Sequence, residues 1–245
     1  MEPNIQEMPL PRVERVRHEL KLRDLEVAAV EPLGPRFVAV TLRGAALADF
    51  VSLGFDDHVK IMIDGPDGQV RRDYTPRRHD RVAGLLTIEF ALHGDGAASD
   101  WARGARPGDR LTVGGPRGSM VVPASLDWHL LVGDSTALPA IARRLDELPA
   151  GTRADVLVLA GANEQRTLAT QADARIRWFD TPAAWLDALR ALALPAGTGF
   201  AWGAGEAASM VQVRQALSEK GLPRQATRVS AYWKRGASAH HEDIE

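Results

Sequence analysis

The segment Arg72-Asp73-Tyr74-Thr75 brings a cation, an aromatic ring and a hydroxyl together within one short predicted strand. Alternate residues of a strand share a face, so Arg72 and Tyr74 project to the same side and Thr75 stands next to them. A flavin needs such groups: a cation at its phosphate, an aromatic face or a hydroxyl along the ribityl chain, and a hydrogen-bond donor at the N5/O4 edge of its ring. Taken alone, the same residues also describe an ordinary strand with an exposed cation.

A glycine-rich loop beginning at His93 follows about 20 residues later. Gly94 and Gly96, with small residues after them, let backbone N–H groups approach a pyrophosphate. Ser99 is placed to cap a helix whose positive end would face that anion. A glycine turn before a short capped helix is the plainer explanation of the loop alone, but the spacing from Arg72 favours the ligand-binding interpretation.

The composition limits the chemistry that side chains can do here. The 245 residues are enough for two modest domains, with 45% hydrophobic and 25% charged residues, as in ordinary globular proteins. The net charge of -2 does not suggest a nucleic-acid partner. No cysteine is present, which excludes disulfides, thiolate nucleophiles, Cys-ligated zinc and iron–sulfur clusters. Redox chemistry would therefore need an organic cofactor or a metal held by other ligands.

The sequence shows no sign of membrane insertion. Residues 1–23 are polar and charged, without an apolar core of signal-peptide length. No stretch approaches the length of about 18 uncharged apolar residues that a membrane-spanning helix needs. We expect a cytoplasmic protein that is a monomer or a weak dimer.

Residues 16–124 have the pattern of a small barrel. Short runs rich in Val, Ile, Leu and Phe are separated by turn sequences such as Gly65-Pro66-Asp67-Gly68. The predicted strands cover residues 24–30, 36–43, 58–63, 72–74, 85–92 and 110–115. This pattern predicts a six-stranded antiparallel barrel.

Residues 125–236 change to alternating strands and helices, after a boundary near residues 123–127. The continuous apolar run Val156-Leu157-Val158-Leu159 is typical of a strand buried on both faces of a parallel sheet. Further strands are predicted over 129–132, 176–179, 199–202 and 228–233, with helices between them. The alternation predicts a doubly wound parallel sheet, and residues 237–245 are predicted to be a flexible tail.

Several motifs in this order resemble the siderophore-interacting branch of the ferredoxin-reductase superfamily. They are the Arg72 strand, the His93 loop, Gly114-Gly115-Pro116-Arg117-Gly118-Ser119, Gly133-Asp134-Ser135-Thr136-Ala137-Leu138-Pro139-Ala140-Ile141, Trp202-Gly203-Ala204-Gly205-Glu206 and Ala231-Tyr232-Trp233-Lys234. The resemblance covers about residues 16–236. It implies a barrel that binds FAD, followed by a domain that binds NADPH or NADH.

The resemblance also implies roles for individual residues. Arg72, Tyr74 and Thr75, with Asp73 in the same strand, would hold the phosphate, ribityl chain and ring edge of FAD. The pyrophosphate and adenosine half would contact His93, Ala97, Ala98 and Ser99. Thr136 would lie near the nicotinamide, and Trp233 beside the flavin. An anionic ferric siderophore, as substrate, would face a basic patch made of Lys60, Arg117, Arg228 and, more loosely, Lys234.

Two positions depart from the family pattern. Ser135 replaces a glutamate, which puts the role of that carboxylate in doubt. Asp180 stands where relatives often carry an arginine suited to the 2′-phosphate of NADPH, and an anion there would favour NADH. Because Arg166 and Arg175 could still supply a cation for the 2′-phosphate, the sequence leaves the choice between NADH and NADPH open.

The sequence thus predicts an NAD(P)H-dependent, FAD-containing reductase that releases Fe(II) from ferric siderophores. A flavin can take up two electrons at once and release them singly to Fe(III), and the transfer needs no catalytic side chain. A general flavin or dye reductase of the same fold and a non-enzymatic siderophore- or flavin-binding module are the alternatives. No metal site is predicted, because His240-His241 stands in a polar tail without rigid support.

Overall fold

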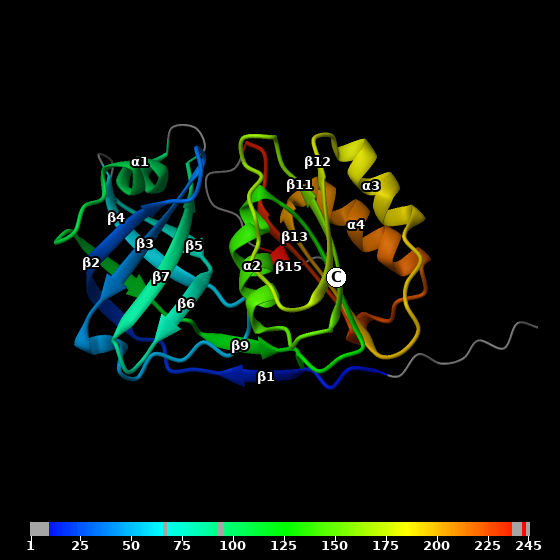
Figure 1. Ribbon diagram of the computed structural model, residues 1–245. Helices are drawn as coiled ribbons and strands as arrows, with labels where there is room; N and C mark the ends of the chain where they lie inside the picture. The colour runs from blue at the N-terminus through cyan, green and yellow to red at the C-terminus, as the bar shows by residue number, and fades with distance from the viewer. Residues whose placement is uncertain (1–9, 66–67, 93–95, 237–241, 244–245) are drawn as a thin grey trace, which may run out of the picture.

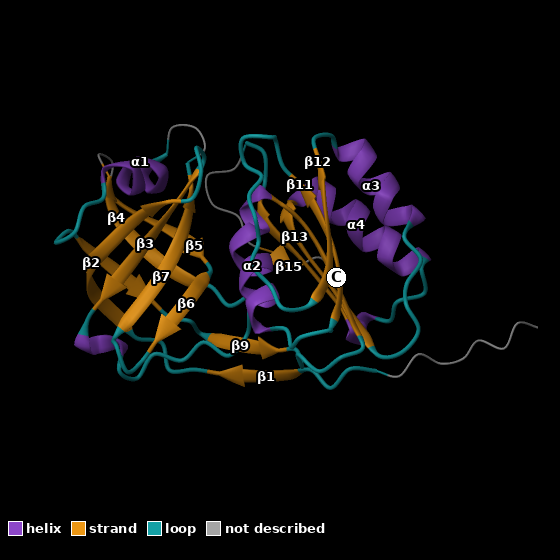
Figure 2. Cartoon of the chain, viewed as in Figure 1, coloured by secondary structure: helices purple, strands orange, loops and turns teal. Residues whose placement is uncertain are grey.

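The computed structural model describes residues 10–65, 68–92, 96–236 and 242–243. They form a barrel-like antiparallel sheet followed by a parallel sheet with helices on its faces (Figure 1, Figure 2). This arrangement confirms the predicted fold class.

Seven antiparallel strands form the first sheet, in the order β5-β4-β8-β2-β3-β7-β6. They are β2 (Leu22–Pro32), β3 (Phe37–Arg43), β4 (Val59–Gly65), β5 (Gly68–Tyr74), β6 (Pro76–Asp80), β7 (Leu85–Ala91) and β8 (Arg110–Gly114). Inward-facing residues such as Leu25, Val40 and Ile61 are fully buried and form the barrel core. Helix α1 (Ala97–Gly104) lies across one end of the barrel and packs Ala102 on that core (Figure 1).

The sequence predicts six strands in this sheet, and β6 is the addition. Its residues, Pro-Arg-Arg-His-Asp, lack the apolar alternation that marks a half-buried strand. β6 is an edge strand whose neighbour in the described sheet is β7, and its proline stands at the first position, where the sheet tolerates a missing N–H. Pairing with β7, rather than its own residue pattern, makes this segment a strand.

A two-stranded antiparallel ribbon runs along the side of both sheets (Figure 2). It pairs β1 (Glu14–Arg17) with β9 (Gly118–Val121). Gly118 is needed at this close approach, because a Cβ there would lie 2.7 Å from the backbone oxygen of Val16. The strands are about 100 residues apart in sequence, so no local pattern indicates their pairing.

Five parallel strands form the second sheet, in the order β12-β11-β10-β13-β14. They are β10 (Trp128–Asp134), β11 (Arg153–Leu159), β12 (Asp173–Phe179), β13 (Gly199–Glu206) and β14 (Thr227–Trp233). The chain moves outward from β10 to β12 and then returns to the other side of β10. The carboxyl ends of β10 and β13 therefore flank a topological switch point, where open α/β sheets bind ligands.

The end of the chain adds a short strand to this sheet. β15 (Glu242–Asp243) pairs antiparallel with residues 230 and 231 of β14. It belongs to the stretch 237–245 that the sequence predicts as a flexible tail, and the rest of that stretch lies outside the described residues.

Helices cover both faces of the parallel sheet (Figure 1). α3 (Pro182–Ala191) and α4 (Ala207–Glu219) pack on one face, where Trp185 and Leu217 are fully buried. The hydroxyl of Thr181 accepts a hydrogen bond from the N–H of Ala184 and caps α3. Short 3-10 turns occupy residues 45–47, 135–137 and 224–226. None of the helices in the described part of the chain is long and apolar enough to span a membrane.

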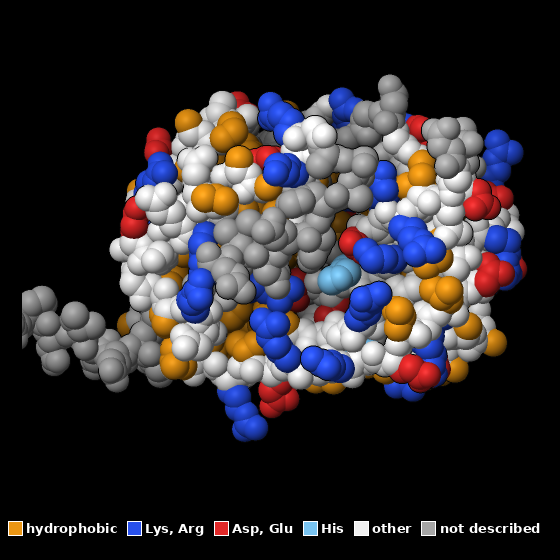
Figure 3. All heavy atoms as spheres, turned by 180° about the vertical axis from the view of Figure 1, so that it is seen from behind, with side chains coloured by type: hydrophobic (Ala, Val, Ile, Leu, Met, Phe, Trp, Pro, Cys, Tyr) orange, Lys and Arg blue, Asp and Glu red, His pale blue; other side chains and the backbone are white. Residues whose placement is uncertain are grey.

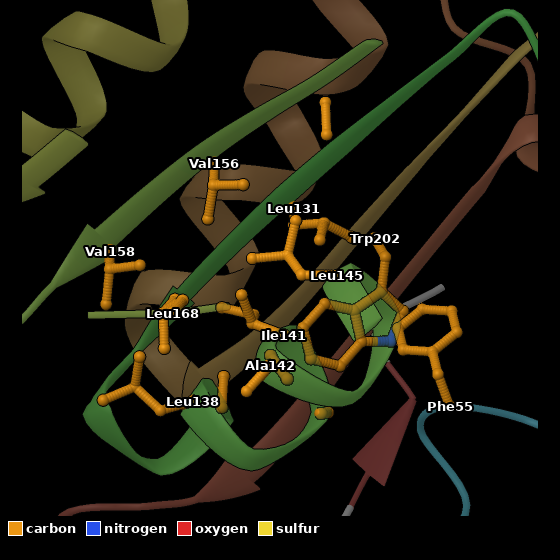
Figure 4. Packing of buried hydrophobic residues seen from close by; sticks show 14 of the residues in the cluster. Phe55, Leu131, Leu138, Ile141, Ala142, Leu145, Val156, Val158, Leu168 and Trp202 are labelled. Atoms are coloured by element: carbon orange, nitrogen blue, oxygen red, sulfur yellow. The ribbon is translucent and has the colours of Figure 1, made fainter. Parts of the chain in front are cut away.

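The other face of the sheet shares its hydrophobic core with the barrel domain. α2 (Leu138–Glu147) lies between them and buries Leu138, Ile141 and Leu145. Phe55, from the barrel domain, packs edge-on against Trp202 of β13, with ring centroids 5.4 Å apart (Figure 4). The two domains thus meet through a continuous apolar contact.

His129, in β10, makes the stability of the fold depend on pH. The residue is 2% exposed, and burial lowers the pKa of its imidazole to about 3. The folded protein keeps the ring neutral, whereas the unfolded chain takes up a proton near the ordinary pKa of about 6.5. The free energy of unfolding should therefore fall as the pH drops below about 6.5, by up to about 1.4 kcal/mol per pH unit from this residue.

Urea unfolding of the wild type and of His129→Gln between about pH 7 and pH 5 measures this effect. Glutamine carries no charge, so the variant should lose less stability over this range. A comparison at about pH 8, where both side chains are neutral, isolates the packing cost of the substitution. Equal losses in the two proteins would contradict the buried neutral imidazole.

Candidate functional site

A cavity of about 250 Å³ lies between the barrel and the carboxyl edge of the parallel sheet. Its walls bring together residues that are far apart in the sequence: Phe37, His58, Arg72, Asp73, Tyr74, Thr75, Glu89, Ala91, Ser99, Thr136, Pro139, Tyr232 and Trp233. Most of the cofactor-binding residues that the sequence predicts are in this set. Ala97 and Ala98 are beside it in the first turn of α1, and His93 lies outside the described residues.

The end of β5 forms the polar part of the barrel wall. The Tyr74 ring packs on Phe90 with centroids 4.5 Å apart, and burial raises the pKa of its phenol to about 12. The hydroxyl therefore stays protonated and can donate a hydrogen bond. Thr75 is 7% exposed, and Arg72 donates from Nη1 to the carbonyl of Arg71 over 2.9 Å.

Helix α1 turns its first residues towards the same cavity. The helix begins at Ala97, with Gly96 as its N-cap residue and no side chain capping it. The prediction that Ser99 caps the helix is wrong, because Ser99 is already the third helical residue. Its hydroxyl donates instead to the carbonyl of Ala91 on β7 over 3.1 Å. The N–H groups of the first turn precede the helical hydrogen bonds, an arrangement that suits an anionic group.

Two charged residues that the sequence analysis did not select, Glu89 and Arg77, form an ion-pair cluster with Arg166, and Glu89 lines the cavity. Glu89 of β7 is 7% exposed and lies 3.2 Å from Nε of Arg77. Arg166, from the loop after β11, pairs with the same carboxylate and places its guanidinium 4.9 Å from the centroid of the Phe37 ring. The sequence offered one indication of this cluster, a glutamate within the apolar strand 85–91. A buried carboxylate requires a charged or hydrogen-bonding partner.

Asp134 is a further residue that the sequence analysis did not place in the site. It ends β10, where it accepts hydrogen bonds from Thr136 and from the indole N–H of Trp233. Both partners line the cavity. The glycine-aspartate pair after an apolar run indicated the strand end, but only the fold brings Trp233 to it.

The four predicted substrate cations differ in their surroundings, and none is among the described residues that line the cavity. Lys60 lies beside it and bonds both carboxylate oxygens of Asp73, at 2.7 and 2.8 Å. Arg117 and Lys234 are exposed. Arg228 is largely buried, with its side chain 16% exposed and its Nε 2.9 Å from Oδ2 of Asp56. Figure 3 shows that several Lys and Arg side chains gather on the face opposite to that of Figure 1.

The donor set fits a flavin nucleotide. Phe37, Pro139 and Tyr232 supply apolar walls, as a flat ring system requires. Tyr74 supplies a donor that stays protonated, and the first turn of α1 supplies N–H groups for a phosphate. A group held here would contact both domains.

Comparison with solved structures first defines the class of the protein. The flavohaemoglobin-like FAD/NAD-binding domain of nitric oxide dioxygenase from Vibrio cholerae has a TM-score of 0.66 at 14% identity, over 86% of this chain and 98% of that one. At this identity the likeness concerns the fold alone. The architecture is that of two-domain proteins with an FAD/NAD-binding fold.

Closer comparisons give the family. Residues 65–120 match the siderophore-interacting FAD-binding domain, and residues 126–236 match the siderophore-interacting protein family. The chain is 34% identical to the NADPH-dependent ferric-chelate reductase of Escherichia coli K12, over 90% of this chain and 96% of that protein. A siderophore utilization protein from T. fusca has a TM-score of 0.88 and 36% identity, covering 94% of this chain and 98% of that one. The chain belongs to the siderophore-interacting protein family.

Proposed function

We propose that this protein is an FAD-dependent reductase that uses NADH or NADPH to reduce iron(III) bound by a siderophore. The observation that carries the proposal is the cavity between the two domains, where the end of β5 faces the carboxyl edge of the parallel sheet. The match to a siderophore-interacting FAD-binding domain and the kinship with a ferric-chelate reductase support it.

The residues of the barrel would hold the cofactor. Arg72 would balance a phosphate charge, Tyr74 would donate to the ribityl chain, and Thr75 would lie at the ring edge. The N–H groups of Ala97, Ala98 and Ser99 would face the pyrophosphate, a role that His93 would share. When bound, FAD supplies the exchange between a two-electron hydride donor and a one-electron metal acceptor.

The other domain would bring the electron donor to the opposite side of the cavity. Thr136 lies at the carboxyl end of β10, the expected place for a nicotinamide. Trp233 bounds the same side. The protein itself exchanges no proton with the iron complex, whose reduction requires proximity and charge complementarity. Fe(II) is held more weakly than Fe(III) by hard oxygen ligands, so reduction releases the metal.

Anaerobic spectroscopy tests the function directly. Protein loaded with FAD should be yellow, lose its colour when NADH or NADPH is added, and regain it when a ferric siderophore is added, while a ferrous chelator collects Fe(II). Recovery with free flavin or dyes but not with the ferric siderophore would indicate a general flavin reductase instead. Bound FAD that neither nicotinamide reduces would indicate a binding module.

The ion pair between Lys60 and Asp73 makes a specific prediction about the substrate. In Lys60→Ala or Arg117→Ala, the KM for anionic ferric chelates should rise about three- to tenfold, with little change for a neutral acceptor. In Asp73→Asn the lysine is freed from its partner, so that KM should fall. Steady-state kinetics with both kinds of acceptor, at equal FAD content, measures this. Arg190→Ala, which removes an exposed cation on α3, is the matched control. Equal changes for anionic and neutral acceptors would argue against a substrate patch.

We infer a preference for NADH from the charge at the carboxyl edge of β11 and β12. Asp180 is exposed directly after β12. Arg166 is the one basic residue between residues 160 and 172, and it is already paired with Glu89. Arg175 is five residues before Asp180 on an extended strand, about 16 Å away along the chain. Arg177, three residues before Asp180, places its guanidinium 5.9 Å from the centroid of the Phe179 ring. We therefore expect a lower KM for NADH than for NADPH.

Asp180→Arg should reduce this preference about tenfold or reverse it, because a cation would then meet the 2′-phosphate. Stopped-flow reduction of the bound flavin by each nicotinamide gives the two affinities. Asp187→Arg makes the same charge change on the exposed side of α3 and should leave the ratio unaltered. If Asp180→Arg leaves the ratio of the NADH and NADPH affinities unchanged, the ribose of the nicotinamide cofactor does not bind beside residue 180.

A further inference from the structure

Asp134 is a buried carboxylate whose two oxygens have different partners. Oδ1 accepts hydrogen bonds from the backbone N–H of Thr136, at 2.9 Å, and from its hydroxyl. Oδ2 accepts from the backbone N–H of Glu206, at 2.9 Å, and from Nε1 of Trp233, at 2.8 Å. The donors come from the turn after β10 and from the ends of β13 and β14. One carboxylate therefore joins three neighbouring strand ends.

The turn at the end of β13 leaves space for this carboxylate. A Cβ added at Gly205 would lie 2.7 Å from Oδ2 of Asp134, closer than real Cβ contacts come. Burial raises the pKa of Asp134, while its four hydrogen bonds act in the opposite direction. Four donors converging on two oxygens are the arrangement that a carboxylate needs when it is removed from water.

Trp233 depends on Asp134 for its orientation. The residue is 38% exposed, much more than the fully buried Trp128, Trp185 and Trp202. Packing alone therefore fixes its ring less firmly. The indole N–H has a charge-assisted hydrogen bond to Asp134 at 2.8 Å. The ring itself bounds the cavity, whereas Asp134 is behind the wall and is not among the described lining residues.

We propose that Asp134 is a positioning residue that fixes the indole of Trp233 as one wall of the flavin site. The proposal rests on the proposed function, because it takes the cavity to be the place of the flavin ring. Thr136 is held by the other oxygen, so the same carboxylate also sets the distance between Thr136 and Trp233. The nicotinamide and the flavin would then meet in a gap whose width Asp134 controls.

A double-mutant cycle on the full-length protein tests the proposal. The variants are Asp134→Ala, Trp233→Phe and the two combined, each titrated with FAD. Asp134→Ala should raise the Kd for FAD about five- to tenfold and increase the fluorescence of bound FAD, because a loosened indole quenches flavin emission less. In the Trp233→Phe background, where the N–H donor is absent, the same substitution should change the Kd less than about twofold.

Thr136→Val is the matched control, because it removes a donor from the other oxygen of Asp134. Its effect on FAD affinity should be the same in the wild-type background and in the Trp233→Phe background. If Asp134→Ala does not fold, Asp134→Asn enters the same cycle, and thermal unfolding checks every variant.

A result that contradicts the role of Asp134 can be told apart from one that contradicts the proposed function. An Asp134 effect of equal size in both backgrounds would show a general structural role and overturn the proposal. A Trp233→Phe variant with unchanged FAD affinity and unchanged fluorescence of bound FAD would instead show that the flavin does not lie against this wall, which contradicts the placement in the proposed function.

Discussion

The contact of Trp202 with Phe55 and Asp56 holds the barrel against the parallel sheet, and the cavity exists only while the two domains keep this arrangement. The Trp202 ring packs on Phe55, and its Nε1 donates to Oδ2 of Asp56 over 3.0 Å. Arg228 reaches the same oxygen from β14. Loss of a buried tryptophan side chain typically costs about 3–5 kcal/mol, against about 1.5–3 kcal/mol for one hydrogen bond to a charged group. The apolar contact therefore supplies the larger part of the free energy that holds the two domains together. The polar contacts set the orientation of one domain relative to the other.

Charged side chains along the same interface select one relative orientation of the two domains and add little to the free energy of unfolding. Arg143 of α2 donates to the hydroxyl and carbonyl of Ser52 and to the carbonyl of Pro76, over 2.8–2.9 Å. Arg77 joins Glu89 to Asp146 of α2. A buried ion pair gains little over a well-packed apolar pair, but leaving one charge without its partner costs about 3–5 kcal/mol. A slipped domain arrangement would leave several such charges unpaired, so the interface admits one orientation.

Much of this arrangement could be predicted from local sequence. The apolar run at 156–159 gave a central strand because continuous burial needs continuous apolar residues. The segment 72–75 was expected on a barrel strand and Thr136 near the nicotinamide, and the fold brings both to one cavity. The polar strand β6, the β1–β9 ribbon and the role of Asp134 were not predictable in this way. Each depends on a partner that is close only in the folded chain, such as Trp233 for Asp134, 99 residues away.

The state of the ionisable groups around the cavity explains which chemistry the site suits. Glu89 is paired with two arginines, Asp73 with Lys60, and the phenol of Tyr74 has its pKa raised to about 12. A general base needs a carboxylate or imidazole that is free to take a proton near neutral pH. These three groups are instead engaged or protonated, so they serve as fixed charges and donors. A wall built from these three groups can orient a bound ring and a nicotinamide through fixed charges and hydrogen-bond donors.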